Sequence, residues 1–161
     1  MMNLQETADM LLKASMERLR DIGIPVSSRI KDSIIINRRA KMRLGCCIFK
    51  NGVYTIEIAE MLLRKYCEEP SEINKKNLTQ VIMHELLHTC KGCGNHGKQW
   101  KQYAQIINEL YGLDIKRAEK MDEQERENHL RNVRYVVVCK AGGYEFVRMR
   151  KSKLVSRPSL Y

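Results

Sequence analysis

Residues 81–100 read VIMHELLHTCKGCGNHGKQW, and the HELLH segment at residues 84–88 is the part that determines the predicted fold. If this segment is helical, His84 and His88 project from the same face, one turn apart. Their ring nitrogens can then reach one metal ion without distortion of the backbone. A catalytic zinc ion keeps one position open for water, whose pKa it lowers to about 7. Glu85 follows the first histidine directly, so the pattern predicts a general base beside that water.

A third ligand is required, and His96 is the best candidate. Seven residues separate it from His88, and two glycines and Asn95 among them are turn formers that can bring the chain back. Apolar and aromatic side chains then recur at roughly helical spacing over residues 97–111. We therefore expect His96 to precede a second helix and to face the first. Three imidazoles beside a carboxylate favour zinc, so one Zn²⁺ is the predicted cofactor.

The HExxH pattern alone is weak evidence for a metal site, because only three of its positions are fixed. The alternative is a helix with two solvated or packed histidines. Three of the chain's four histidines fall within thirteen residues, and the pattern lies in an apolar run where unpaired polar groups are costly to bury. Both features favour the metal site. The fourth histidine, His129, lies in a charged run, and we expect it to be solvated.

The HELLH segment, the loop after it, His96 with its following glycine, and Trp100 together resemble the SprT-like metalloproteases, the family of bacterial SprT and animal Spartan. The resemblance covers most of the chain. It implies an α+β, zincin-like metalloprotease domain with a small mixed sheet packed on helices, acting on a protein or peptide substrate. It also implies zinc ligands at His84, His88 and His96 and a catalytic base at Glu85. In zincin folds an edge strand pairs with the substrate backbone, a role implied here for one strand of a hairpin.

The composition is that of a soluble globular chain with one sizeable core: 161 residues, 43% hydrophobic and 30% charged. No apolar run approaches the roughly 20 residues of a membrane helix. The first residues lack the basic start and apolar block of a secretory signal. We therefore expect a cytoplasmic monomer with no membrane partner, in which the six cysteines are thiols or metal ligands rather than disulfides.

Periodicity and turn residues predict the order of elements in the first part of the chain. Asn51-Gly52 between two apolar runs is a strong hairpin signal. Asn74 or Asn77 is the predicted N-cap of the helix that carries the HELLH segment. The expected helices cover residues 3–21, 59–66, 74–90 and 97–111, and the expected strands cover residues 33–37, 44–49 and 53–58.

Three segments are predicted: a metalloprotease domain over residues 1–115, a charged helix or linker over 116–132, and a basic β-hairpin extension over 133–161. Many members of the resembled family end in a zinc ribbon with four cysteines. Cys139 stands where the first cysteine of a ribbon would fall, but Gly142 occupies the place of the second. We expect a degenerate or truncated ribbon that binds no zinc, since a four-cysteine site needs all four thiolates.

The charge balance suggests an acidic partner. The formal net charge is +10, and residues 131–161 hold eight Lys or Arg against one acid. DNA is the first candidate partner. Arg148, Arg150, Lys151 and Lys153 are candidate nucleic-acid contacts, and a solvated basic hairpin is the alternative.

Cys90 and Cys93 form a Cys-x-x-Cys inside the metal-site loop. They are candidates for a second metal, which needs two further ligands. Redox chemistry and incidental, simply packed thiols are the alternatives.

Two hypotheses of different classes follow. In the first, the chain is a zinc-dependent endopeptidase in which activated water attacks a peptide carbonyl, and the resemblance extends this to DNA-associated substrate proteins. In the second, the chain is a nucleic-acid-binding domain whose metal site is mainly structural. The net charge supports the second hypothesis, and Glu85 beside two histidines supports the first.

Overall fold

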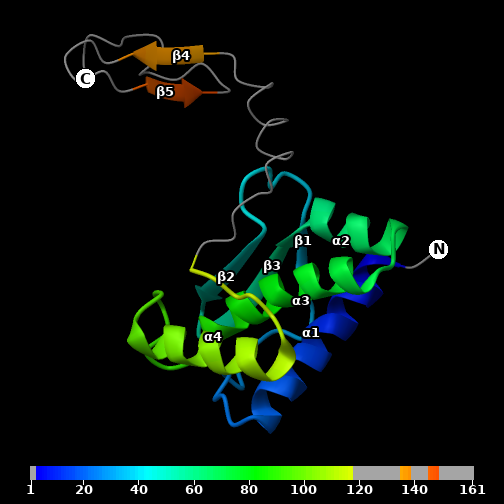
Figure 1. Ribbon diagram of the computed structural model, residues 1–161, viewed down its shortest axis with the longest axis vertical. Helices are drawn as coiled ribbons and strands as arrows, with labels where there is room; N and C mark the ends of the chain where they lie inside the picture. The colour runs from blue at the N-terminus through cyan, green and yellow to red at the C-terminus, as the bar shows by residue number, and fades with distance from the viewer. Residues whose placement is uncertain (1–2, 118–134, 139–144, 149–161) are drawn as a thin grey trace. The chain divides into compact units, whose positions relative to one another are not determined.

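The computed structural model describes residues 3–117, 135–138 and 145–148, and the chain divides into two compact units, Met1–Glu119 and Lys120–Tyr161 (Figure 1). The first unit combines four helices with a three-stranded sheet, which confirms the α+β prediction at this level. Its elements are α1 (Leu4–Asp21), β1 (Ile35–Asn37), β2 (Gly45–Lys50), β3 (Val53–Ala59), α2 (Glu60–Glu68), α3 (Glu72–Leu87) and α4 (Lys98–Tyr111).

In the second unit, β4 (Tyr135–Val138) and β5 (Glu145–Arg148) pair antiparallel. The residues that connect them lie outside the described part of the chain, as do Cys139, most of the predicted charged segment and the candidate contacts at 150, 151 and 153. The hairpin extension, its basic surface and the degenerate zinc ribbon therefore stay predictions.

The sheet of the first unit has the strand order β1-β3-β2 and is mixed. β1 runs parallel to β3, with Ile36 opposite Ile58, and β2 runs antiparallel to β3. The predicted hairpin is confirmed: Asn51 and Gly52 connect β2 to β3 with φ of 52° and 78°. Positive φ at both central residues is what a two-residue turn of type I′ requires. β2 is consequently an edge strand.

Helix α3 is the centre of the unit and contacts α1, α2, α4, β2 and β3. It is surrounded, so the ten residues from Leu78 to Leu87 are all buried, polar ones included. A helix buried on every side has no amphipathic pattern, and this one was predicted from its apolar run alone. None of the helices in the described part of the chain is long and apolar enough to cross a membrane.

The predicted start of α3 is wrong by two residues. The helix begins at Glu72, and the Ser71 hydroxyl caps it by accepting a hydrogen bond from the Asn74 N–H at 3.2 Å. The Asn74 side chain instead donates to the Glu69 carbonyl at 2.8 Å. A serine after a proline is an equally good cap, and an asparagine inside the first turn misled the prediction.

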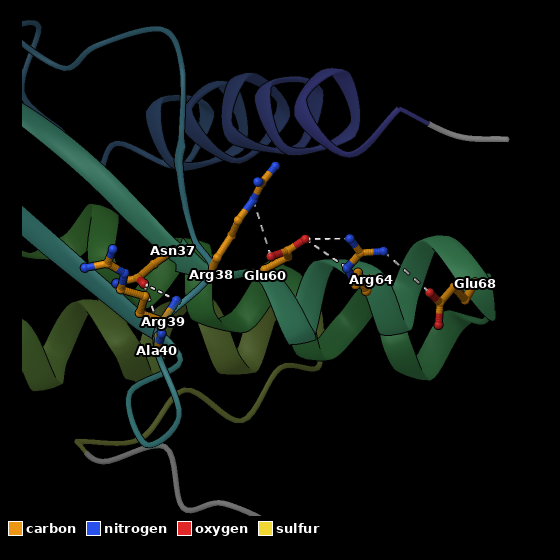
Figure 2. A network of polar contacts seen from close by, with 7 residues as sticks. All are labelled: Asn37, Arg38, Arg39, Ala40, Glu60, Arg64 and Glu68. Carbon is orange, nitrogen blue, oxygen red and sulfur yellow. Dashed lines mark hydrogen bonds and ion pairs between the residues drawn. The ribbon is translucent and has the colours of Figure 1, made fainter.

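The loop between β1 and β2 is ordered at its start by a turn (Figure 2). The Asn37 side-chain oxygen accepts hydrogen bonds from the backbone N–H groups of Arg39 and Ala40, at 2.8 and 2.9 Å. Arg38, whose side chain is 83% exposed, approaches the carboxylate of Glu60 at 3.7 Å, and such an ion pair is worth at most about 1 kcal/mol. The side-chain turn of Asn37 is thus the main local constraint.

Glu57 on β3 holds both ends of the same loop. One carboxylate oxygen accepts from the Asn37 side-chain amide and from the Arg43 guanidinium, both at 2.7 Å. The hydrogen bond from Arg43 to Glu57 is the main reason that the pKa of Arg43 is raised above its ordinary value. The loop therefore enters β2 from a fixed direction, which matters because β2 forms one wall of the candidate site.

Candidate metal centre

Three histidines from two elements meet at the C-terminal end of α3. His84 lies on the helix, His88 is its C-cap, and His96 directly precedes Gly97, the N-cap of α4. One ligand nitrogen of each lies within 4.8 Å of the other two, and the Nε2 atoms of His84 and His96 are 3.0 Å apart. Two nitrogens bound to one zinc ion at 2.0–2.1 Å would lie about 3.3 Å apart. The group could therefore hold a metal ion.

The loop between His88 and His96 also fixes the tautomer of His88. Its Nδ1 lies 2.8 Å from the backbone carbonyl of Cys93, which can only accept, so Nδ1 carries the proton. The lone pair of Nε2 is then free for a metal. Gly92, with φ of 78°, and the hydrogen bond from the Cys93 N–H to the Cys90 carbonyl at 3.1 Å form the turn that places this carbonyl.

Burial favours the neutral form of two of the three histidines. Burial, followed by the charges of His88 and His96, lowers the pKa of His84 to about 4, against a weaker opposing hydrogen bond with the backbone of Lys116. Burial, followed by the charges of His88 and Arg117, also lowers the pKa of His96. Metals bind neutral imidazole, so these shifts favour the ligand form at neutral pH.

Trp100 forms the floor beneath all three rings. Its ring centroid lies 4.9 Å from that of His84, 5.9 Å from His88 and 4.6 Å from His96. The side chain is 1% exposed and is the only tryptophan in the chain. The sequence shows Trp100 one helical turn after His96, but this role under the whole cluster was not predicted. A rigid aromatic floor limits how far the imidazoles can rotate.

Glu85 is buried and lines a cleft of about 680 Å³. The cleft is lined by the three histidines, by the loop before β2 and by residues of the β2–β3 hairpin. The carboxylate lies toward β2, since after burial its charge is the next cause that raises the pKa of the Cys47 thiol, to about 12. A base, three nitrogen donors and an open cleft are thus in one place.

Gly45 is the residue that lets β2 approach Glu85. A Cβ atom at this position would lie 2.8 Å from Val81 Cγ1 and 2.9 Å from both Cγ and Oε1 of Glu85. Any side chain would therefore displace the strand or the carboxylate. This contact joins residues forty positions apart, and the sequence pattern contained no signal for it.

Residues 12–119 match the SprT-like family. The chain belongs to the SprT-like family. Comparisons with curated proteins and with solved structures find no match. The three histidines and Glu85 all lie within the span that matches the SprT-like family.

Cys90 and Cys93 lie in the loop of the SprT-like site and are both buried, with thiol pKa values raised by burial, to about 12 for Cys90. Within the described residues, the histidine cluster is the only group of three or more potential ligands. A second metal at this pair stays a prediction. The contact that the structure shows for Cys93 is the one between its backbone carbonyl and His88. Cys46 and Cys47 are half-buried on β2 and line the cleft.

Replacing Gly45 by alanine is expected to destabilise the first unit and to displace the Glu85 carboxylate, while the three histidines stay in place. The added methyl group would push on Val81 and Glu85, and overpacking of this kind costs about 1–3 kcal/mol of stability. Urea unfolding, zinc content and hydrolysis rate should be measured together. Gly94→Ala is the matched control, because Gly94 lines the same cleft and a methyl group added there would have nothing within 4 Å. Equal effects of the two variants would contradict the role assigned to Gly45.

Proposed function

We propose that this chain is a zinc-dependent endopeptidase of the SprT-like type with a zincin-like fold. The observation that carries the proposal is the buried Glu85 carboxylate beside three convergent imidazoles in an open cleft. A bound zinc ion would supply a Lewis acid and a water of lowered pKa. His84, His88 and His96 would hold it, the first two one turn apart and the third brought back by the loop.

Glu85 is proposed as the general base and then the general acid. It takes the proton of the attacking water and delivers it to the nitrogen of the leaving amine. The backbone of β2 at Gly45 passes close to the Glu85 carboxylate and restricts where it can lie, so the base is held in place before the substrate binds. A purely structural metal site has no use for a buried carboxylate at this point, which favours the enzyme over the binding module.

The free edge of β2 is proposed to bind the substrate backbone. The Ala59 N–H donates to the Leu44 carbonyl at 2.9 Å, so the backbone of Leu44 is hydrogen-bonded to β3. In an antiparallel ladder bonding alternates along a strand. Gly45, Cys47 and Phe49 therefore direct their N–H and C=O groups to the free edge, and an extended peptide could add there as a further strand.

We propose DNA-associated proteins as the substrate class of this endopeptidase. The support is the net charge of +10 and the concentration of basic residues in the C-terminal segment. Binding of this kind should weaken steeply as salt rises.

Metal removal tests the proposed function. Treatment with a chelator is expected to stop cleavage of an unfolded protein such as casein, and zinc is expected to restore it up to one equivalent per chain. Magnesium serves as the control and should not restore cleavage, because it prefers oxygen ligands. Cleavage that continues after elemental analysis shows the metal to be gone would refute the proposal.

A further inference from the structure

The β2–β3 hairpin has one face that is covered at one end and open at the other. Side chains alternate along a strand, so Gly45, Cys47 and Phe49 share a face with their partners Ile58, Ile56 and Tyr54. Helix α3 contacts both strands (Figure 1), and its residues Val81 and Glu85 lie against the Cβ position of Gly45, on this face. Ile56 and Ile58 are 0% and 1% exposed, whereas Phe49 is 57% exposed. This face is therefore buried under α3 at the Ile56 and Ile58 end and exposed at the end near the turn.

The open end of this face is an aromatic wall of the cleft. The rings of Phe49 and Tyr54 lie 4.5 Å apart at an interplanar angle of 41°. Both rings and Cys47 line the cleft that contains Glu85 and the three histidines. Burial raises the pKa of the Cys47 thiol to about 12, so this thiol stays protonated at neutral pH. Two aromatic rings and an uncharged thiol thus offer a charged substrate side chain no ion-pair partner of their own.

We propose that Cys47, Phe49 and Tyr54 form a subsite that selects a large apolar side chain of the substrate. The inference rests on the proposed function, because it requires a substrate strand along β2. In such a pairing the residue opposite Phe49 places its side chain on the same face, against the aromatic wall.

The register along β2 sets the distance of this subsite from the bond that is cut. Gly45 lies against Glu85, and Phe49 lies four residues further along the strand. At about 3.3 Å per residue the two positions are roughly 13 Å apart. The selected side chain should therefore lie about four residues from the scissile bond, always on the same side of it.

A simpler role for the two rings is to stabilise the hairpin as a cross-strand pair. This role predicts a lower melting temperature when Phe49 is replaced, and an equal effect on every substrate. A specificity role predicts a change in the ratio of rates between substrates, which stability alone does not alter.

Cleavage-site mapping tests the inference. Wild-type protein is incubated with an unfolded protein mixture, the cut sites are read by mass spectrometry, and peptide pairs are then made with Leu or Ser at the selected position. We expect wild type to prefer the Leu peptide roughly tenfold in kcat/KM, the scale on which apolar pockets discriminate. Phe49→Ser is expected to abolish that ratio, because the Leu peptide loses its advantage over the Ser peptide, and Phe49→Leu is expected to retain it.

The control variant is Ile73→Ser, which removes an apolar side chain that is 72% exposed on the first turn of α3 and does not line the cleft. It should leave the ratio unchanged. If wild type cleaves peptides without an apolar preference, the subsite is refuted and the proposed function stands. This result uses wild type alone, so it holds even if Phe49→Ser fails to fold. An equal loss on both peptides in Phe49→Ser overturns it as well. No cleavage of any substrate by zinc-loaded wild type overturns the proposed function, and the subsite with it.

Discussion

A Glu85→Gln variant is expected to keep its zinc and to lose hydrolysis. Glutamine has the shape of glutamate and fits the space beside Gly45, but it cannot accept the proton of the attacking water. General bases contribute about 10²–10⁴-fold to rate, so kcat should fall within that range. Zinc affinity should stay close to that of wild type, because the three imidazoles and not the carboxylate are the proposed ligands. Hydrolysis rates and zinc content per chain check the two parts separately.

Glu72→Gln is the matched control for this experiment. Glu72 lies in the first turn of the same helix and is exposed, so its replacement removes one negative charge without touching the cleft. Loss of a favourable interaction with the helix dipole costs about 0.3–1 kcal/mol of stability and should leave kcat unchanged. Undiminished hydrolysis in Glu85→Gln would reject the mechanism. Loss of zinc from that variant would place the carboxylate among the ligands.

Local signals predicted the parts of the site that are close in sequence. The spacing of His84 and His88 needs only a helix, and Asn51-Gly52 needs only a two-residue turn. The predicted end of α4 at residue 111 is confirmed, and Gly112 follows as the C-cap with φ of 61°. These features follow from the backbone geometry of a few consecutive residues, so no knowledge of the tertiary structure was required.

The packing of distant parts of the chain was predicted only in outline, because the family resemblance implied a mixed sheet but not which strands pair. The approach of Gly45 to Glu85 depends on how β2 packs against α3, and the parallel pairing of β1 with β3 depends on a crossover. The hydrogen bond from His88 to Cys93 uses a backbone carbonyl, which every residue has. The identity of residue 93 therefore does not reveal this contact in the sequence. The return of His96 to the cluster was predicted from turn residues and family resemblance, not from any local period.

His96→Ala is expected to weaken zinc binding at least about 100-fold. Structural zinc sites with four ligands bind with about 10–16 kcal/mol, so one ligand accounts for about 3 kcal/mol. In addition, His84 Nε2 would lose the ring that now lies 3.0 Å away. Competition with a chelator of known affinity measures the change. Trp100 provides a second readout, because its ring lies within 5.9 Å of all three imidazoles and its emission should respond to metal binding.

His129→Ala is the control, because the sequence predicts that the fourth histidine is solvated in a charged run. It should bind one zinc ion with the affinity of wild type. If His96→Ala also bound zinc as tightly as wild type, the third ligand would have to come from a residue outside the histidine cluster. Two zinc ions in wild type, with one retained in His96→Ala, would instead support a separate site at Cys90 and Cys93. The stoichiometry thus separates the histidine site from the cysteine pair in a single measurement.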